Sequence, residues 1–132
     1  MVDTDVQHIL VIDDEPRIAS LLQRQLGAAG FAVQTVDRGT TALTQIQLQL
    51  PDLVIVDLRL PDLSGYELCW ILRRLYDRPR LPILVLTGVE QSTEQLHREA
   101  AEADAYLHKP YDAVELLRTV RGLLHCEGEE SS

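Results

Sequence analysis

Three apolar stretches of the sequence each end abruptly in polar side chains. The stretches are residues 9–12, 53–56 and 83–86, and the residues that follow them are Asp13 and Asp14, Asp57, and Thr87. A continuous apolar run of this length fits a strand buried on both faces of a parallel sheet. Ligands of such sheets bind beyond the carboxyl ends of the strands. A lone acid after one strand would merely open a turn, but three strands with the same ending predict that these groups meet at one edge.

Close carboxylates repel one another, and this repulsion indicates the chemistry of the predicted edge. At an effective dielectric constant of about 20, two unit charges ~4 Å apart cost about 4 kcal/mol. Protonation of one acid, or binding of a cation, would relieve that cost. Oxygen ligands suit Mg²⁺, which binds through one or two carboxylates, keeps several waters and accepts a phosphoryl oxygen as a further ligand. The alternative is that the acids are simply solvated where loops begin.

Thr87 and Lys109 extend the acids into a constellation for phosphoryl transfer. Lys109 follows a short fifth predicted strand, so we expect it at the same edge of the sheet. A lysine, a hydroxyl and a metal ion around one carboxylate resemble a site where the protein positions groups and neutralises the transferring oxygens. A carboxylate can itself accept a phosphoryl group covalently.

The elements that must position these residues alternate between strands and helices. Strands are expected at residues 7–12, 31–36, 53–57, 83–86 and 103–107. Helices are expected to begin at Pro16, Gly39 and Gly65, within residues 91–102, and after Asp112. Glu115 would complete a capping box at the last helix. The helix within 91–102 has few large apolar side chains and is predicted to be weakly anchored, and the fifth strand is expected to carry Asp104.

This alternation predicts an α/β fold: a single, doubly wound (βα)5 domain with a parallel five-stranded sheet. The first, third and fourth strands have unbroken apolar runs and should be central, whereas polar residues dilute the second and fifth, which should be edges. The predicted strand order is therefore 2-1-3-4-5. The domain should span residues 7–126, after a lead of residues 1–6 and before a disordered polar tail, residues 127–132.

Composition argues against several classes of protein. The chain has 132 residues, a length typical of one domain. Its formal net charge of −9 would repel phosphate backbones, so no direct binding of nucleic acid is expected. No apolar run approaches the ~20 residues of a membrane helix, and the first residues do not resemble a signal peptide. We therefore expect a cytoplasmic protein with no membrane partner, in which Cys69 is a small core residue.

Four segments of the sequence together resemble a known family. They are residues 12–16 (IDDEP), 57–65 (DLRLPDLSG), 86–88 (LTG) and 103–110 (ADAYLHKP). At these separations, and over residues 7–125, the chain resembles the response regulator receiver domains of the CheY-like superfamily. The resemblance implies a flavodoxin/CheY-like fold and a phosphoprotein of two-component phosphorelay signal transduction.

The resemblance also implies which residues form the phosphorylation site. Asp57 would accept a phosphoryl group from the phosphohistidine of a sensor histidine kinase or a histidine phosphotransfer protein. Asp14, Asp57 and the backbone carbonyl of Arg59 would ligate Mg²⁺ directly, and Asp13 would hold a metal-bound water. The protein would not be an enzyme in the ordinary sense, because it would catalyse only its own phosphorylation and dephosphorylation.

The remaining residues would carry the response. The resemblance implies that Thr87 and Lys109 bind the phosphoryl oxygens, that Tyr106 is the aromatic switch, and that the Lys109–Pro110 peptide bond is cis. The fourth helix, the fifth strand and the last helix would shift together as the output face.

Three rival functions remain open on the sequence. A haloacid-dehalogenase-like, Mg²⁺-dependent phosphatase would also use an Asp at a strand end, but it requires a second Asp two residues later, where this chain has Arg59. A receiver-fold scaffold that works without phosphorylation is disfavoured because the set of acids is complete. A flavodoxin-like FMN carrier is disfavoured by the acids of residues 13–15, which would repel phosphate.

The output of the protein is not fixed by its sequence. No effector motif follows the last helix, so the output is either a partner protein or a missing effector domain. A homodimer is an open expectation: Asp104 fits the paired charges by which DNA-binding members dimerise, but Thr119 stands where they usually carry arginine. Trp70 is expected at the rim under arginine stems, and Arg73, Arg74, Arg78 and Arg80 are expected to form a solvated helix end.

Overall fold

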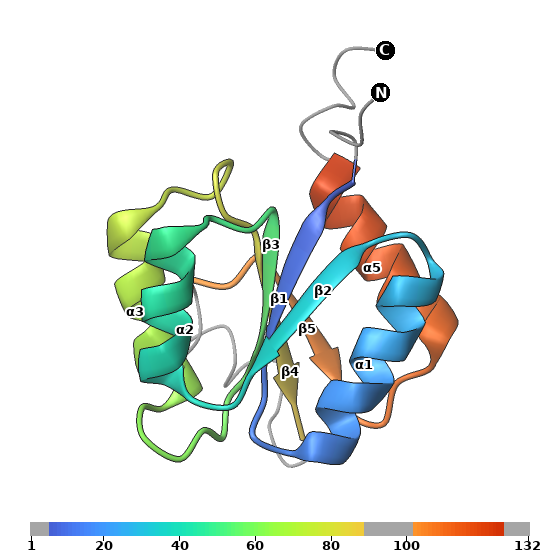
Figure 1. Ribbon diagram of the computed structural model, residues 1–132, viewed down its shortest axis with the longest axis horizontal. Coiled ribbons are helices and arrows are strands. Elements are labelled where there is room, and N and C mark those ends of the chain that lie inside the picture. Colours follow the sequence, from blue (N-terminus) through green and yellow to red (C-terminus); the bar gives the residue numbers. More distant parts are fainter. Residues whose placement is uncertain (1–5, 89–101, 126–132) are drawn as a thin grey trace.

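The computed structural model describes residues 6–88 and 102–125, and it is a three-layer α/β sandwich. Its strands are β1 (His8–Ile12), β2 (Ala32–Val36), β3 (Leu53–Asp57), β4 (Ile83–Thr87) and β5 (Ala105–His108). Its helices are α1 (Pro16–Ala28), α2 (Gly39–Leu48), α3 (Gly65–Leu75) and α5 (Ala113–His125). In Figure 1 the sheet stands between two helical layers, with α2 and α3 on one face and α1 and α5 on the other.

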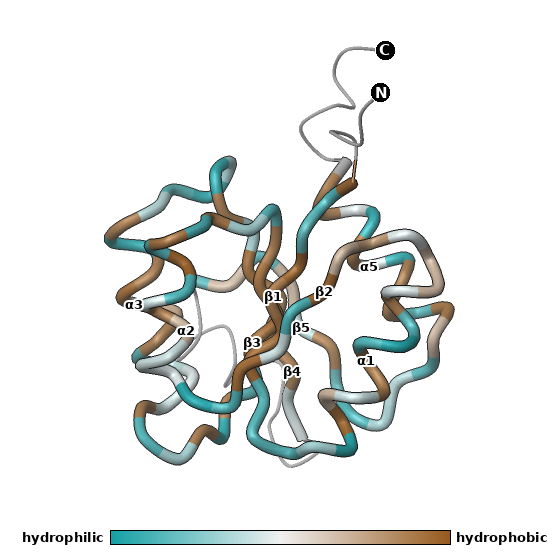
Figure 2. Tube along the Cα trace, in the orientation of Figure 1, coloured by the Kyte–Doolittle hydropathy of each residue, from teal (hydrophilic) through white to brown (hydrophobic). Residues whose placement is uncertain are grey.

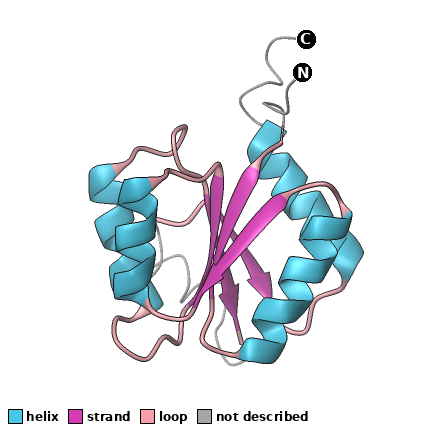
Figure 3. Ribbon diagram, in the orientation of Figure 1, coloured by secondary structure: helices cyan, strands magenta, loops and turns pink. Residues whose placement is uncertain are grey.

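The sheet is parallel, and its strand order is β2-β1-β3-β4-β5. This order confirms the predicted α/β fold, including the placement of the second and fifth strands at the edges. All residues of β3 and β4 are buried, as expected for strands covered by helices on both faces. Figure 3 shows that the strands run the same way, so their carboxyl ends share one edge of the sheet.

Alternation along the strands divides the core into two clusters, one on each face of the sheet. Leu10 and Ile12 of β1 pack toward α2 and α3, together with Ile46 and Leu72. Ile9 and Val11 of β1 pack toward α1 and α5, as part of a cluster that includes Leu22, Leu26, Leu116 and Val120. Figure 2 shows hydrophobic residues concentrated along the central strands. Cys69 belongs to the first cluster and is fully buried, which confirms its predicted role in the core.

The helix starts follow the predicted signals, and one of them has a cap that was not predicted. Pro16 opens α1, and the N–H of Glu115 donates to Asp112 Oδ1 at 2.7 Å, which confirms Asp112 as the N-cap of α5. At α3 the Ser64 hydroxyl accepts from the N–H of Glu67 at 3.1 Å. No helix of the described residues has the length and apolarity needed to cross a bilayer.

The structure corrects some predicted element bounds. β1 and β2 begin one residue later than expected, and β4 extends to Thr87. The prediction that the fifth strand carries Asp104 is wrong, because β5 begins at Ala105. Asp104 instead exchanges two hydrogen bonds of 2.8 Å with Ile83, through its backbone N–H and its carboxylate. The predicted helix within residues 91–102 lies outside the described residues, except for Glu102.

Candidate functional site

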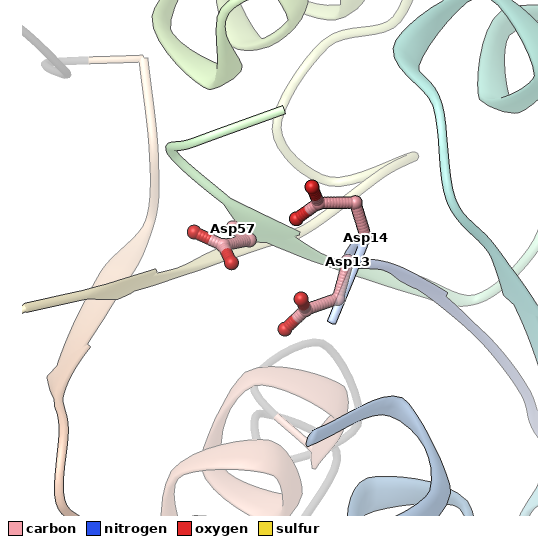
Figure 4. Close-up of side chains that lie close together, drawn as sticks. All are labelled: Asp13, Asp14 and Asp57. Atoms are coloured by element: carbon pink, nitrogen blue, oxygen red, sulfur yellow. The ribbon is translucent and has the colours of Figure 1, made fainter. Parts of the chain in front are cut away.

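The three predicted acids meet at the carboxyl edge of the sheet. Asp13 and Asp14 follow β1, and Asp57 ends β3, the strand paired with β1. Each acid offers one carboxylate oxygen, and these oxygens all lie within 4.8 Å of one another. Figure 4 shows Asp13 and Asp14 leaving the end of β1 in different directions, with Asp57 facing them from β3. The predicted convergence is therefore confirmed, with Asp13 and Asp57 buried and Asp14 exposed.

The Asp13 carboxylate is buried, and only one of its two oxygens accepts a hydrogen bond from the described residues. Its Oδ1 accepts the N–H of Glu15 at 2.9 Å, whereas its Oδ2 is buried and has no hydrogen-bond partner in the described part of the chain. Burial raises the pKa of Asp13 to about 7; the Glu15 N–H and Lys109 oppose the rise, and the neighbouring Asp57 adds to it. A cation beside the three acids would favour the ionised form of this carboxyl.

Asp57 is held between a backbone donor and an ammonium group. Its Oδ1 accepts the N–H of Arg59 at 3.0 Å, and its Oδ2 lies 3.4 Å from Lys109 Nζ. The same ammonium is 3.9 Å from Glu15 Oε1. Lys109 is the only lysine in the sequence. Its N–H donates to the carbonyl of Thr87 at 2.8 Å, and the Lys109–Pro110 peptide bond is cis, as the resemblance implied.

Thr87 ends β4, the strand beside that of Asp57. Its side chain is buried, and its hydroxyl donates weakly to the carbonyl of Gly88 at 3.4 Å. Thr87, Gly88 and Lys109 line a cleft of about 460 Å³ together with Asp57. The rest of its lining comes from Asp14, Glu15, Leu58, Arg59 and Tyr66. The cleft leaves room in front of the Asp57 carboxylate for a group larger than a water molecule.

Tyr106 lies on β5, paired in register with Val85 of β4. It is half-buried and packs against the core cluster on the α2 and α3 face. Burial is the main cause that raises the pKa of its hydroxyl above the usual value. Tyr106 is thus one strand away from Thr87, separated from it along the sheet by Leu86 and Leu107.

The loop between β3 and α3 is fixed by two contacts that sequence reasoning missed. Gly65 lies so close to the preceding turn that a Cβ there would meet Leu58 Cα at 2.5 Å and the Asp57 carbonyl oxygen at 2.7 Å. Asp62 caps α2 from a distance, because it accepts from the N–H groups of Gly39 and Thr40 at 2.9 and 3.1 Å. The Thr40 hydroxyl also donates to Asp62 at 2.7 Å.

Asp104 and two arginines form an ion network beside the amino ends of β4 and β5, at the end of the sheet opposite to the three acids. Arg73 and Arg78 each donate to the Asp104 carboxylate at 2.9 Å. Arg73 also donates to the carbonyls of Glu102 and Leu81, at 2.8 and 3.0 Å, and only 9% of its side chain is exposed. The prediction of a solvated arginine run is therefore wrong for Arg73, since its guanidinium supplies partners to otherwise open backbone carbonyls.

Arg74 lies at the exposed rim, as predicted. The Arg74 guanidinium lies 4.3 Å from the ring centroid of Trp70, which is 52% exposed, so the predicted rim aromatic under an arginine is confirmed. Asp104, which was expected to pair with a charge of a second copy, instead forms ion pairs with Arg73 and Arg78 of its own chain.

Comparison with known proteins identifies relatives of this arrangement. A family model described as "Response regulator receiver domain" matches residues 9–121. The phosphate regulon transcriptional regulatory protein PhoB of Rhizobium meliloti is 41% identical over 116 residues, which are 88% of this chain and 51% of PhoB. The DNA-binding response regulator MtrA of Mycolicibacterium smegmatis is 35% identical over 128 residues, 97% of this chain and 55% of MtrA. The chain spans about half the length of the curated relatives it matches.

Solved structures show the same fold. The response regulator TrrA of Thermotoga maritima, in complex with Mg²⁺ and BeF, has a TM-score of 0.81 and 33% identity, covering 90% of this chain and 100% of that one. The receiver domain of sensor histidine kinase PA1611 from Pseudomonas aeruginosa, with a magnesium ion in its active site cleft, has a TM-score of 0.80 and 27% identity, covering 90% and 98%.

Proposed function

Because this chain belongs to the response regulator receiver domain family of two-component signalling, we propose that Asp57 accepts a phosphoryl group in a Mg²⁺-dependent reaction. The proposal rests on the groups that lie around Asp57. They are the carboxylates of Asp13 and Asp14, the ammonium of Lys109 and the buried hydroxyl of Thr87. Of the rival functions, the phosphatase lacks its second acid, since residue 59 is an arginine whose backbone N–H donates to Asp57.

The acids fit a magnesium ion. Three carboxylate oxygens within 4.8 Å of one another, two of them on buried residues, are the hard ligands that this ion prefers. Asp14, Asp57 and the carbonyl of Arg59 would hold the ion directly, and Asp13 would hold one of its waters. When bound, Mg²⁺ supplies positive charge beside the oxygens of the transferring group.

The side chains around Asp57 would then carry the transfer. A carboxylate oxygen of Asp57 forms a bond to phosphorus, while the P–N bond of the donor phosphohistidine breaks and its electron pair returns to the imidazole nitrogen. The Arg59 N–H holds Oδ1 and so orients the carboxylate. The Lys109 ammonium, 3.4 Å from Oδ2, neutralises the oxygens of the arriving group, and the Thr87 hydroxyl leaves its weak contact with Gly88 to bind one of them.

The response would begin at Thr87 and reach Tyr106. Phosphorylation adds negative charge and three acceptor oxygens to Asp57, and Thr87 and Lys109 answer this change. Tyr106, half-buried on the adjacent strand, would turn inward as the end of β4 moves. Among the described elements, β5 and α5 would form the output face, a two-state element biased from the acidic cleft.

The partners follow from the family. A sensor histidine kinase or a histidine phosphotransfer protein would donate the phosphoryl group, and the protein would catalyse only its own phosphorylation and dephosphorylation. Relatives such as MtrA are DNA-binding regulators about twice as long as the matched region, so an effector domain or a separate partner protein would carry the output. We propose a cytoplasmic location, as for response regulators, with a homodimer as one form of the activated state.

Incubation with Mg²⁺ and acetyl phosphate tests the proposal. Intact-mass spectrometry should detect one added phosphoryl group, which disappears in Asp57→Asn and in the presence of a chelator. Asp52→Asn is a matched control, because Asp52 precedes the same strand at its far end, where its carboxylate accepts the N–H of His8. An adduct that persists in Asp57→Asn, or that forms equally well without Mg²⁺, would contradict the proposal.

A further inference from the structure

Two buried oxygen atoms without a hydrogen-bond partner lie on the same face of the sheet. Among the described residues, Asp13 Oδ2 and Tyr111 Oη are both enclosed and unpaired. The N–H of Asp13 donates to the Val36 carbonyl at 3.0 Å, so the alternation of β1 continues to this residue. Asp13 is thus in phase with Ile9 and Val11, which belong to the cluster beneath α1 and α5. Figure 4 shows its side chain directed toward these helices, away from Asp14.

Tyr111 lies on the same face of the sheet, in the loop between β5 and α5. It follows Pro110 after β5, and its ring packs against the cluster that contains Val11, Leu86 and Leu107. Burial raises the pKa of Tyr111 to about 12, and the second cause is the charge of Asp13. The hydroxyl therefore keeps its proton at neutral pH and can act as a donor, and Asp13 is the acid close enough to influence it. Asp13 Oδ1 already has a donor in the Glu15 N–H, whereas Oδ2 has none.

We propose that Tyr111 is a positioning residue for the acidic site, and that its hydroxyl donates to a single buried water that in turn donates to Asp13 Oδ2. Buried polar atoms are nearly always paired, and a hydroxyl and a carboxylate oxygen satisfy each other's requirement. This bridge would fix the position of the Asp13 carboxylate beside the other two acids, as hydrogen bonds behind metal ligands commonly do. This inference rests on the proposed function, because it assigns Asp13 to the Mg²⁺ site.

Tyr111→Phe removes only the hydroxyl and keeps the ring that packs in the core. Loss of a hydrogen bond behind a metal site commonly weakens binding about tenfold, so titration calorimetry should give about tenfold weaker Mg²⁺ affinity for this variant. Tyr76→Phe is the matched control: it removes a hydroxyl at the C-terminus of α3, remote from the acids, and should bind Mg²⁺ as the unaltered protein does. Thermal unfolding without Mg²⁺ verifies that both variants fold.

A combined variant separates a positioning role from a general one. If Tyr111 acts through Asp13, adding Tyr111→Phe to Asp13→Asn should cause no further loss of Mg²⁺ affinity. The inference is overturned if Tyr111→Phe binds Mg²⁺ within about twofold of the unaltered protein, a change well below that typical of such bonds, or if the two substitutions act independently. Failure of the unaltered protein to bind Mg²⁺ would instead overturn the proposed function, and this inference with it.

Discussion

Lys109 Nζ lies 3.4 Å from Asp57 Oδ2, at the edge of the sheet where β3 and β5 both end. Under the proposed function, this ammonium would neutralise the oxygens of a group arriving on Asp57, and its positive charge would oppose the binding of a metal ion at the three acids. Removing the Lys109 charge should therefore slow the phosphorylation of Asp57 without weakening the binding of Mg²⁺.

Lys109→Met removes the charge and keeps most of the length of the side chain. Loss of one preorganised donor typically costs roughly 100-fold in rate, so we expect the Asp57 adduct to form from acetyl phosphate roughly 100-fold more slowly. Mg²⁺ should bind at least as tightly as before, because three acids lose a competing cation. Mass spectrometry and calorimetry measure the two effects. Unchanged adduct formation would remove Lys109 from the reaction.

Gly65→Ala tests whether close packing holds the loop after Asp57. The added Cβ would lie 2.5 Å from Leu58 Cα, so the backbone must shift, at a cost of about 1–3 kcal/mol in the free energy of unfolding. Gly122→Ala in α5 is the control, because its Cβ would meet nothing within 4 Å; it should stabilise the helix by about 0.5–1 kcal/mol. Urea unfolding compares the two variants. Equal stability of both variants would contradict the close approach at Gly65.

Arg73→Met tests the ion network around Asp104. Removing one partner of a buried pair commonly costs about 3–5 kcal/mol; because Arg78 and the Ile83 N–H still serve Asp104, we expect about 3 kcal/mol. Arg74→Met, one residue along, removes a side chain that is 49% exposed and should cost less than about 1 kcal/mol. Chemical unfolding of the two variants measures the difference. Similar costs would mean that the Arg73 guanidinium contributes no more than a surface charge.

The contact of Asp62 with the start of α2 predicts a dependence of stability on pH. Hydrogen bonds from the Thr40 hydroxyl, the largest cause, and from the Gly39 N–H lower the pKa of Asp62 from 3.8 to about 2 in the folded chain. A lowered folded pKa adds stability that is complete above pH 3.8 and is lost as the pH falls through about 2. Asp62→Ala should therefore be less stable than the unaltered protein near pH 7, and the difference should narrow below pH 3.8. A difference that stays constant on acidification would show that the carboxylate charge has no part in the contact.

The strand ends were predictable because each ends in an abrupt change of polarity. Four buried apolar residues followed by an acid mark both the register of β3 and the edge at which Asp57 emerges. Once the strand order followed from the same runs, Asp13, Thr87 and Lys109 had to lie near Asp57. Local sequence patterns therefore identified the residues of this site, and the predicted strand order made them neighbours.

Contacts between side chains and distant elements could not be predicted, because no local sequence pattern marks them. Arg73 belongs to an arginine run typical of a solvated helix end, and only its tertiary partners, the carbonyls of Glu102 and Leu81, explain its burial. Asp62 caps a helix that begins 23 residues earlier, so no local capping signal exists at Gly39. Tyr111 follows a proline and reads as one more apolar residue, and only the structure shows that its hydroxyl is enclosed without a hydrogen-bond partner among the described residues.

The single lysine of the chain has a practical consequence at the bench. Reagents that acylate primary amines find no other side chain to modify, and Lys109 is still 24% exposed. Amide formation would cancel its charge beside Asp57, so coupling a dye or a sensor chip through this lysine would alter the proposed phosphorylation site. Probes for this protein are better anchored through an engineered tag, because the Cys69 thiol is buried in the core.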